Sequence, residues 1–473
     1  MRKKKETGII NEEALKKKAS IKTIAMMGQG YKLNNKSEKG NQINVLFDAT
    51  VIANALYKNE GRTGIFFVAF NILSEMLQRN ELHISLYCEK SSEDDLKEAL
   101  KNYFSNNYDI SIITDKLIVN TSIKNVKKVL SGIDVYFSPL FRIPSRIRQF
   151  EHISRFTVLY DAILLAFPEY FPLKQDWLLD MIDEITNEDY YFAISENTKK
   201  DFIKYVPQID PEKINVAYLA ASDNFHPCED LRNGDTAILE KYHLPLDKKY
   251  IFSLCTIEPR KNLIFSVKCF ISFIKKNQID NLYFFLGGSQ WDAFVKELEL
   301  AVDHFKEYKD KVIKVGYIDD SDLSYFYSGS EFFVYPSLYE GFGLPVLEAM
   351  QCGVPVITSN TSSLPEVIGD AGMIINPRSE GEFIDAMEKL YFNSKFRNEL
   401  SKKGIERAKS FNWANTVDIM VNELIKVVSK KNDEILAHNF SDKTTARKSK
   451  WSIILQIPNM IFNFSKMIFW KAQ

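Results

Sequence analysis

The residue types best suited to chemistry stand together in one stretch, EFFVYPSLYEGFGLPVLEAMQCGVPVITS. A buried strand is predicted to end at Ser337, and Gly341 and Gly343 let the loop that follows approach a ligand closely. Pro345 suits the first position of a helix, and a later glycine, Gly353, ends that helix. The free amides and the positive dipole end at such a helix start form a site for an anion.

Two carboxylates frame this anion site, Glu340 in the loop and Glu348 about one turn into the helix. A carboxylate beside a phosphate is unfavourable unless it accepts hydrogen bonds from hydroxyl groups. The pairing therefore predicts a ligand with both phosphate and sugar hydroxyls, and a nucleotide-sugar has both. The alternative for either residue alone is structural, with Glu348 favouring the helix dipole and Glu340 exposed in the loop.

Two cations stand upstream in the segment TIEPRKN, just past the predicted strand YIFSLC. Arg260 offers a planar guanidinium and Lys261 a compact ammonium, which suit diphosphate oxygens and the charge on a departing phosphate. A solvated basic turn is the alternative. Downstream, NTSSLPEVIG predicts a short helix capped by Ser362 or Ser363, in which Glu366 need only serve the helix dipole.

These residues need a scaffold, and the chain supplies two runs of alternating strands and helices. The first contains the strands INVLFDAT, HISLYC, VYFSPL, FTVLYD, YYFAIS and INVAYL, and the second contains YIFSLC, LYFFLGG, VIKVGYI, EFFVYPS, PVIT and GMIIN. Alternation of this kind predicts parallel sheets. Ligands bind outside the carboxyl ends of such strands, so two units that face one another would form a cleft.

Four parts of the chain are predicted: a mobile arm over residues 1–42, α/β domains over 43–235 and 236–430, and a tail over 431–473. Basic and aromatic residues predominate at the end of the tail, a composition that suits a helix lying on an anionic membrane surface. The alternative is a helix packed on the protein itself or on a partner, and Pro458 would kink any continuous helix there.

The composition sets further limits. With 473 residues, 45% of them hydrophobic and 26% charged, the chain has an ordinary globular composition, which excludes a mainly disordered protein. Its 61 basic and 62 acidic residues leave a net charge of −1, so no global field attracts nucleic acid. Scattered cysteines and the lack of a signal-peptide core or long apolar run predict no metal site, a cytoplasmic location and no membrane span.

At these residues the chain resembles the retaining glycosyltransferases of family 4. The resemblance covers residues 43–430 and rests on YDAILLAFPEYF, SENTKKDF, EPRKNL, VGYIDDSDLSYFY and VYPSLYEGFGLPVLEAMQCGVPVITSNTSSLPEVIGDAG. Glu340 and Glu348, with seven residues between them, match the family's E-x7-E element. The resemblance implies the GT-B fold, in which two Rossmann-like domains face a central cleft. Such enzymes move a sugar from a nucleoside diphosphate to a hydroxyl, keep its anomeric configuration and usually need no metal.

The resemblance also implies a role for each candidate residue. Glu340 would contact the donor sugar, and Glu348 would hold the ribose hydroxyls. Arg260 and Lys261 would neutralise the leaving diphosphate. Asp161 would orient the acceptor or the sugar, unless it only caps the helix AILLAF. The remaining donor-binding positions are expected at Gly64, Gly341, Phe342, Gly343 and Leu344.

Three departures from the family pattern stand out. Many relatives have His-Asp where this chain has Tyr160 and Asp161, and Tyr160 would either hydrogen-bond the donor sugar or pack in the cleft wall. The first-domain loop reads NEGRTGIF, with one glycine fewer than the usual form. Cys255 stands where a glycine is common before the EPRKN turn.

We therefore expect a cytoplasmic enzyme, peripheral on the inner face of the cell membrane. It would move a mannose-type or related hexose from a nucleoside-diphosphate donor to a growing surface glycan or a lipid-linked acceptor, without a cofactor. Tyr160 in place of histidine motivates an alternative, a non-catalytic GT-B partner that binds nucleotide or glycan and stabilises an active transferase. The intact E-x7-E element argues against that alternative, and the motifs resemble a GT-B nucleotide-sugar epimerase much less.

Overall fold

The computed structural model describes most of the chain between positions 42 and 435. The described ranges are 42–54, 64–88, 90–104, 117–119, 123–140, 143–168, 182–228, 236–246, 248–288 and 292–435. The predicted N-terminal arm, apart from Gln42, and the basic aromatic end of the tail lie outside these ranges.

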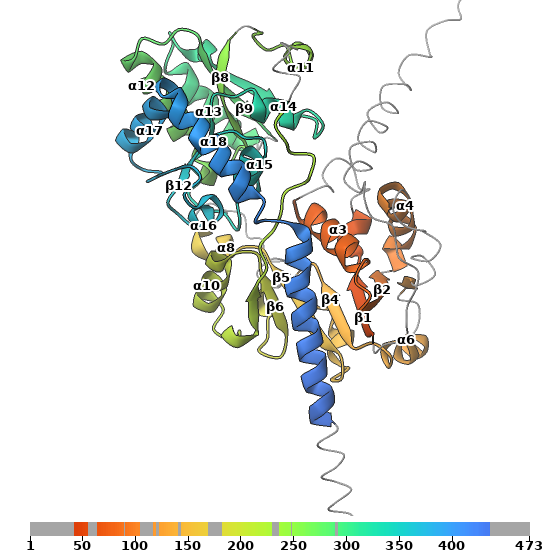
Figure 1. The fold of residues 1–473 in the computed structure, drawn as a ribbon. Helices are drawn as coiled ribbons and strands as arrows, with labels where there is room; N and C mark the ends of the chain where they lie inside the picture. The colour runs from red at the N-terminus through yellow and green to blue at the C-terminus, as the bar shows by residue number, and fades with distance from the viewer. Residues whose placement is uncertain are drawn as a thin grey trace, which may run out of the picture. The chain divides into compact units, whose positions relative to one another are not determined.

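The first run of strands forms a seven-stranded parallel sheet in the order β3-β2-β1-β4-β5-β6-β7 (Figure 1). Its strands are β1 Ile43–Asp48, β2 Leu82–Cys88, β3 Leu117–Val119, β4 Val135–Ser138, β5 Ser154–Leu159, β6 Tyr190–Ala193 and β7 Ile214–Val216. Every residue of β4 and β5 is buried, as expected for strands covered by helices on both faces. The sequence pattern does not predict β3.

The second run forms a six-stranded parallel sheet in the order β10-β9-β8-β11-β12-β13. Its strands are β8 Lys249–Leu254, β9 Leu282–Gly287, β10 Val312–Gly316, β11 Phe333–Tyr335, β12 Val356–Ser359 and β13 Met373–Ile375. The prediction that β11 ends at Ser337 is wrong, because the strand ends at Tyr335. Pro336 follows, and its nitrogen has no hydrogen to donate to a neighbouring strand.

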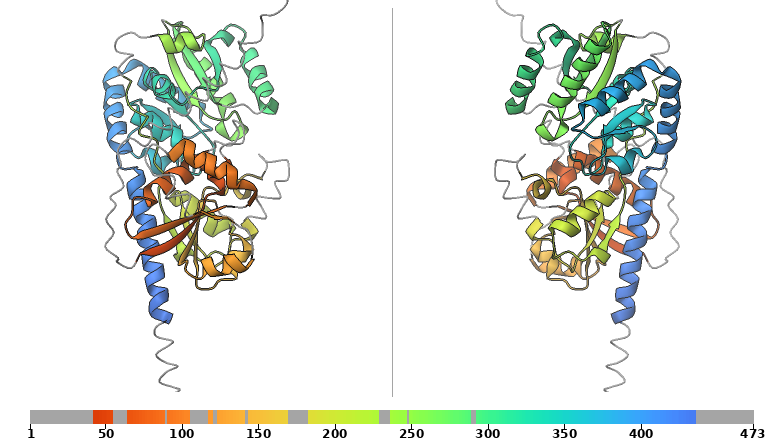
Figure 2. Two further views of the ribbon diagram at one scale, coloured as in Figure 1. Left: turned by 90° about the vertical axis from the view of Figure 1, so that its right-hand side faces the viewer. Right: turned by 90° about the vertical axis from the view of Figure 1, so that its left-hand side faces the viewer.

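Helices connect the strands of both sheets (Figures 1 and 2). Those of the first sheet are α2 Thr50–Ala53, α3 Gly64–Met76, α4 Glu93–Phe104, α6 Ile123–Leu130, α7 Ser145–Arg148, α8 Ile163–Ala166 and α10 Glu196–Tyr205. Those that follow are α11 Ala237–Lys241, α12 Leu263–Lys276, α13 Asp292–Asp303, α14 Leu323–Ser328, α15 Leu344–Gln351, α16 Leu364–Ile368, α17 Glu380–Phe392 and α18 Ser394–Ala408.

The strand order decides which helices share a face of the second sheet. The chain moves outward through β8, β9 and β10, then returns to β11 and moves the other way through β12 and β13. Because crossovers between parallel strands are right-handed, α12 and α13 lie on one face and α15 and α16 on the other. The contacts agree, since α12 packs against α13 and α17 while α15 packs against α16 and α18.

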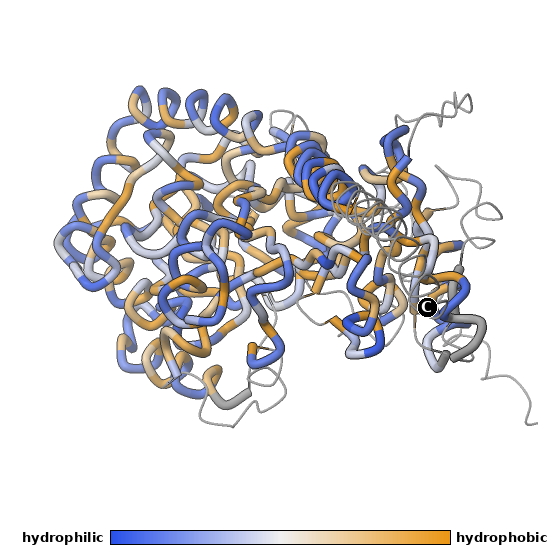
Figure 3. Tube along the Cα trace, turned by 90° about the horizontal axis from the view of Figure 1, so that it is seen from below, coloured by the Kyte–Doolittle hydropathy of each residue, from blue (hydrophilic) through white to orange (hydrophobic). Residues whose placement is uncertain are grey.

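The apolar residues of the helices repeat at helical spacing and turn toward the sheets. In α3, for example, Phe66, Phe70 and Leu73 are buried and share one face. Figure 3 shows this pattern as orange and blue turns that alternate within single helices. In the second sheet the fully buried Phe252 lies against Phe326 and Phe333, so aromatic rings fill much of the space between layers.

By its internal contacts the chain divides into Met1–Met420, which holds both sheets, and Val421–Gln473. A long helix spans residues 413–435. Its beginning, within the first unit, contacts the turn after α3 through an Arg79–Asp418 ion pair of 2.9 Å. No helix among the described residues is long and apolar enough to cross a membrane. The domain limits predicted from the sequence stay predictions.

Candidate active site

The candidate site lies where the strand order of the second sheet reverses. Strands β8 and β11 are neighbours at this point, but their connections leave in opposite directions. The carboxyl end of β8 leads into the TIEPRKN segment, and the carboxyl end of β11 leads into the loop of Glu340. Such a reversal leaves a crevice at the carboxyl ends, which is where parallel α/β sheets bind ligands.

The turn after β8 is held rigidly. Residues Pro259–Lys261 form one turn of 3-10 helix, and Asn262 then takes a left-handed conformation with φ of 61°. The Asn262 side-chain amide donates to the carbonyls of Pro336 and Pro377, 3.2 and 2.8 Å away. These bonds tie the turn to the segments after β11 and β13, so the two cations beside Asn262 have fixed backbone positions.

Glu340 bridges the two predicted cations. Its Oε2 lies 2.8 Å from Nη1 of Arg260, and its Oε1 lies 2.6 Å from Nζ of Lys261. Lys261 also donates to the hydroxyl of Tyr335, 2.7 Å away at the end of β11. Burial of Glu340 disfavours its charged form, but Arg260 and Lys261 outweigh that effect and lower its pKa to about 2. The structure thus brings the three predicted residues into one charged cluster.

Glu258 is a further member of this cluster, and the sequence pattern does not single it out. It is buried, and its Oε1 lies 2.7 Å from Nη2 of Arg260. Burial raises its pKa, which the Arg260 charge partly opposes. The signal was present in the sequence, because Glu258 directly precedes the Pro-Arg-Lys turn. With two cations against two carboxylates, Arg260 and Lys261 already have protein partners.

Two positions in the loop after Glu340 require glycine, one for its backbone angle and one for a close contact. Gly343 has a φ of 119°, which favours glycine, and it precedes α15 directly. A side chain at Gly341 would place its Cβ 2.4 Å from the carbonyl oxygen of Tyr160. Phe342 is buried between them, and Leu344 is the first residue of α15, so Pro345 takes the second helical position rather than the first.

Glu348 lies within α15, away from the two cations. Its Oε2 accepts a hydrogen bond of 2.7 Å from the hydroxyl of Tyr327 in α14. Burial of the carboxyl raises its pKa to about 7, although the Tyr327 bond acts in the opposite direction. A partly buried carboxyl that titrates near neutrality is common at functional sites. The sequence pattern indicates Glu348 but not its partner Tyr327.

Tyr160 and Asp161 follow β5 of the first sheet and reach the glycine loop of the second. The Tyr160 hydroxyl donates to the carbonyl of Pro139 at 2.7 Å, a partner within the first sheet's own loops. Asp161 accepts the amide of Ile163 at 3.1 Å, as its alternative capping role requires. Its Cβ lies 3.0 Å from where a Cβ on Gly341 would be, so Asp161 stands beside the loop of Glu340.

Gly64 occupies a different setting from the other candidates. It is the first residue of α3 and is exposed, and a Cβ at this position would meet no heavy atom within 4 Å. The loop before it, whose sequence resembles the Gly-rich loop of the family, lies outside the described residues. The structure therefore does not bring Gly64 into contact with the charged cluster.

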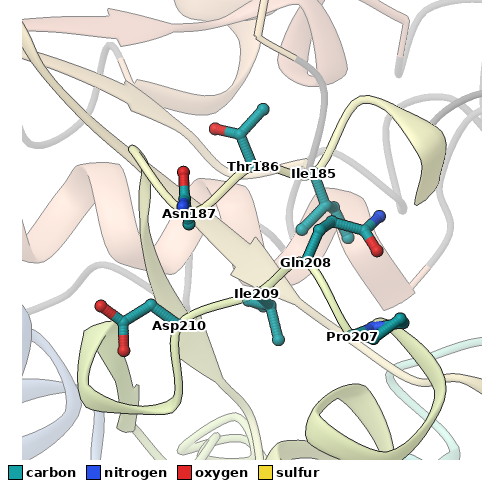
Figure 4. Close-up of a pocket in the computed structure, with 7 residues that line it drawn as sticks. All are labelled: Ile185, Thr186, Asn187, Pro207, Gln208, Ile209 and Asp210. Atoms are coloured by element: carbon teal, nitrogen blue, oxygen red, sulfur yellow. The ribbon is translucent and has the colours of Figure 1, made fainter.

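A separate pocket lies in the first sheet, before the amino ends of β6 and β7 (Figure 4). Its lining residues are Ile185, Thr186, Asn187, Pro207, Gln208, Ile209 and Asp210. Because parallel sheets bind ligands at the opposite, carboxyl ends, this pocket has no part in the site described above. Within the described ranges, no His, Cys, Asp and Glu side chains gather in a group that could hold a metal ion.

Comparison with known proteins agrees with this geometry. Residues 235–407 match the family model of glycosyl transferases group 1. O-antigen chain mannosyltransferase B of Escherichia coli is 29% identical over 293 residues, which cover 61% of this chain and 73% of that protein. Serotype-specific mannosyltransferase WbdA of Escherichia coli is 28% identical over 61% of this chain, a match that spans only 35% of WbdA.

The fold is also that of solved glycosyltransferase structures. HepE from Anabaena, in complex with UDP, superimposes with a TM-score of 0.59 at 14% identity, over 81% of this chain and 100% of that chain. Two Rossmann-like parallel sheets of this arrangement define the GT-B fold, as predicted. These matches agree with the family indicated by the motifs, and they support the chain as a glycosyltransferase.

Proposed function

We propose that the chain is a retaining mannosyltransferase that extends a surface glycan. It would move mannose, or a related hexose, from a nucleoside diphosphate to a hydroxyl of the growing glycan or of its lipid-linked precursor. The observation that carries the proposal is the Arg260–Glu340–Lys261 cluster at the reversal point of the second sheet. The names of the Escherichia coli relatives support mannose as the sugar and an O-antigen-like chain as the acceptor.

When a donor binds, the charged residues of the cluster would exchange one another for groups of the donor. Phosphate oxygens would accept hydrogen bonds from Arg260 and Lys261, and sugar hydroxyls would donate to Glu340, which loses those cations. The amides at the start of α15, preceded by Gly343, would face the diphosphate. Glu348 would accept hydrogen bonds from the ribose. This exchange lets each buried charge keep a partner throughout, which matters because an unpaired buried charge is strongly unfavourable.

In the reaction, the bond between the sugar and the diphosphate breaks as the acceptor hydroxyl attacks from the same face. Arg260, Lys261 and the start of α15 stabilise the negative charge that develops on the departing diphosphate. The departing phosphate oxygen accepts the proton of the attacking hydroxyl, so no separate base is required. Asp161 orients the acceptor or the sugar. We propose that no metal or cofactor takes part, since these protein groups already supply positive charge where a diphosphate would lie.

The first experiment identifies the donor. UDP-, GDP-, ADP- and dTDP-sugars are compared by thermal shift, and we expect GDP-mannose to raise the melting temperature most. Transfer from that donor is then measured with EDTA present, and the anomeric configuration of the product is determined by NMR. Full transfer by both Glu340→Ala and Lys261→Ala would show that the cluster is not the catalytic site.

Hydrolysis of nucleotide-sugars in the absence of acceptor tests the alternative, a non-catalytic partner. A pure binding protein releases no nucleoside diphosphate from any nucleotide-sugar, whereas a transferase slowly hydrolyses its donor in the absence of acceptor. We expect slow release from the wild-type chain and none from Glu340→Ala. Release that is equal in the two proteins would point to a contaminating hydrolase.

We further propose that the enzyme works at the inner face of the cell membrane. The basic aromatic end of the tail supports this location, although residues 436–473 lie outside the described ranges. Deleting residues 441–473 is expected to lower binding to liposomes that contain anionic phosphatidylglycerol while leaving GDP-mannose binding intact. Equal liposome binding by the two proteins would contradict the membrane proposal.

A further inference from the structure

The first turn of α10 and its cap residue touch both sheets. Ser195 precedes α10 and Thr198 lies in its first turn, and both side chains are fully buried. Their hydroxyls lie between two backbone carbonyls. One belongs to Tyr160, which follows β5 of the first sheet, and the other to Gly341, in the loop after β11 of the second.

Each hydroxyl has one proton, and the distances indicate where each proton goes. Ser195 Oγ lies 2.7 Å from the carbonyl oxygen of Gly341, and Thr198 Oγ1 lies 3.0 Å from that of Tyr160. The amide of Thr198 donates to Ser195 Oγ at 3.0 Å, which caps the helix. This assignment gives each carbonyl a donor, and it joins one loop from each sheet through the same helical turn.

Glu366 holds the same helical turn from the other side. This residue lies in α16 of the second sheet, and its carboxylate accepts the amides of Glu196 and Asn197, 2.8 and 3.0 Å away. These amides belong to the first turn of α10, where backbone donors have no partner within the helix. A carboxylate is also favoured there by the helix dipole. Glu366 therefore serves a helix dipole, but that of α10 rather than that of its own short helix.

This junction lies beside two candidate catalytic groups. Gly341 directly follows Glu340, and a Cβ on Gly341 would lie 2.4 Å from the Tyr160 carbonyl and 3.0 Å from Asp161 Cβ. The Thr198 bond holds Tyr160, and with it the neighbouring Asp161. The Ser195 bond holds the loop of Glu340. A shift of this helical turn would therefore change the separation of Asp161 and Glu340.

We propose that Thr198 and Glu366 are positioning residues for sugar transfer, which set the placement of Asp161 relative to Glu340 through the first turn of α10. The inference rests on the catalytic roles proposed above for those two carboxylates. The phosphate-binding groups, Arg260 and Lys261, belong to the second sheet alone. Loss of the junction therefore slows transfer but leaves the affinity for the donor unchanged.

The experiment measures turnover and donor affinity separately, with GDP-mannose as the probe. We expect Thr198→Val and Glu366→Ala to lower kcat by about tenfold to a hundredfold, as small misplacements of reacting groups do. The Kd of GDP-mannose should stay within about twofold of the wild-type value, since no phosphate contact is lost. Thr198→Ser keeps the hydroxyl and should restore kcat.

Matched controls remove similar bonds that do not join the two sheets. Thr358 is fully buried and donates to the carbonyl of Tyr335 at 2.9 Å, within the second sheet. Asp210 accepts the amide of Glu212 at 3.0 Å, which caps a short helix within the first sheet's connections. Thr358→Val and Asp210→Ala should leave kcat near the wild-type value.

Hydrogen exchange supplies a readout that does not depend on activity. The amides of Glu196 and Asn197 should exchange faster in Glu366→Ala than in the wild type, and at an unchanged rate in Asp210→Ala. Unchanged exchange, unchanged kcat, or an equal loss of kcat and donor affinity would each overturn the positioning role. A wild-type protein that neither binds nor hydrolyses a nucleotide-sugar would instead contradict the proposed function.

Discussion

The surroundings of Glu340 and Glu348 differ sharply, although only seven residues separate the two glutamates. Glu340 lies in a loop between two cations, which lower its pKa to about 2 despite burial. Glu348 lies in a helix with a tyrosine hydroxyl as its hydrogen-bond partner, and burial raises its pKa to about 7. Burial alone therefore does not decide the charge of a carboxyl group in this site; the partners that face it do.

Because their pKa values differ, Glu340 and Glu348 would have different roles in the proposed reaction. Before a donor binds, Glu340 is ionised at physiological pH, because Arg260 and Lys261 hold its pKa low. Glu348 titrates close to neutrality, so its affinity for hydroxyl donors depends on pH. Four substitutions test this contrast, and the expected effects become smaller from the first to the last.

Lys261→Met is expected to have the largest effect. It leaves buried Glu340 with one cation and removes positive charge from the leaving group. Turnover should fall by about 100- to 1,000-fold, and the free energy of unfolding by about 3 kcal/mol. Steady-state kinetics and urea denaturation measure the two effects. Lys276→Met is the control, because Lys276 forms an exposed ion pair of 2.8 Å with Glu388, and its urea midpoint should not change.

Glu340→Gln should destabilise the protein in a pH-dependent way. The folded-state pKa of about 2 is below the ordinary value of 4.5, so the ionised group stabilises the fold above pH 4.5 and loses this effect as the pH falls toward 2. The variant should lie about 3 kcal/mol below the wild type at pH 7 and closer to it at pH 3. A difference of equal size at both pH values in urea denaturation would contradict the low pKa.

Glu348→Gln should act with the opposite sign. The folded-state pKa of about 7 is above the ordinary value, so ionisation of Glu348 weakens the fold as the pH rises from 4.5 through 7. The variant should be more stable than the wild type at pH 8 by about 1–3 kcal/mol, and no more stable at pH 4. Donor affinity of the wild type should weaken below pH 7, and calorimetry should find no such dependence in the variant.

Tyr327→Phe should have the smallest effect. Loss of the hydroxyl removes a bond that favours the ionised form of Glu348, so the pKa of Glu348 should rise further. The pH midpoint of donor binding should move upward in the same direction. Tyr250→Phe is the matched control, since its buried hydroxyl donates to the carbonyl of Phe326 at 3.0 Å, away from the site. A midpoint that moves equally in both variants would exclude a specific role for Tyr327.

Most of the fold could be predicted because long apolar runs that alternate with helical segments are typical of buried strands in a parallel sheet. The exceptions have physical causes. Strand β3, Leu117–Val119, is a run of three apolar residues between Lys116 and Asn120, without the proline that follows β11 or the glycine that precedes β13. The predicted end of β11 is two residues too late, because Tyr335, Pro336 and Ser337 look equally compatible with an extended chain. Only the lack of an amide hydrogen on Pro336 separates them.

The residues of the site could be predicted where a local motif marks them. Their partners could not be predicted where tertiary contacts determine them. Glycines and a proline beside charged residues pointed to the loop of Glu340. Spacing could not reveal that Arg260 and Lys261 both pair with Glu340 itself, or that Glu366 caps a helix of the other sheet. These partners are distant in the chain, so their distances depend on how the sheets and loops pack.

The cysteines make the native protein convenient for attaching a spectroscopic label. Four of the five are buried, and burial raises the pKa of Cys255, Cys269 and Cys352 to about 12. Cys228 alone is partly exposed, and it lies on the connection between β7 and β8. Because maleimides react with accessible thiolates, one dye would attach at the link between the two sheets without any substitution. Its fluorescence would then follow movements of that link during turnover.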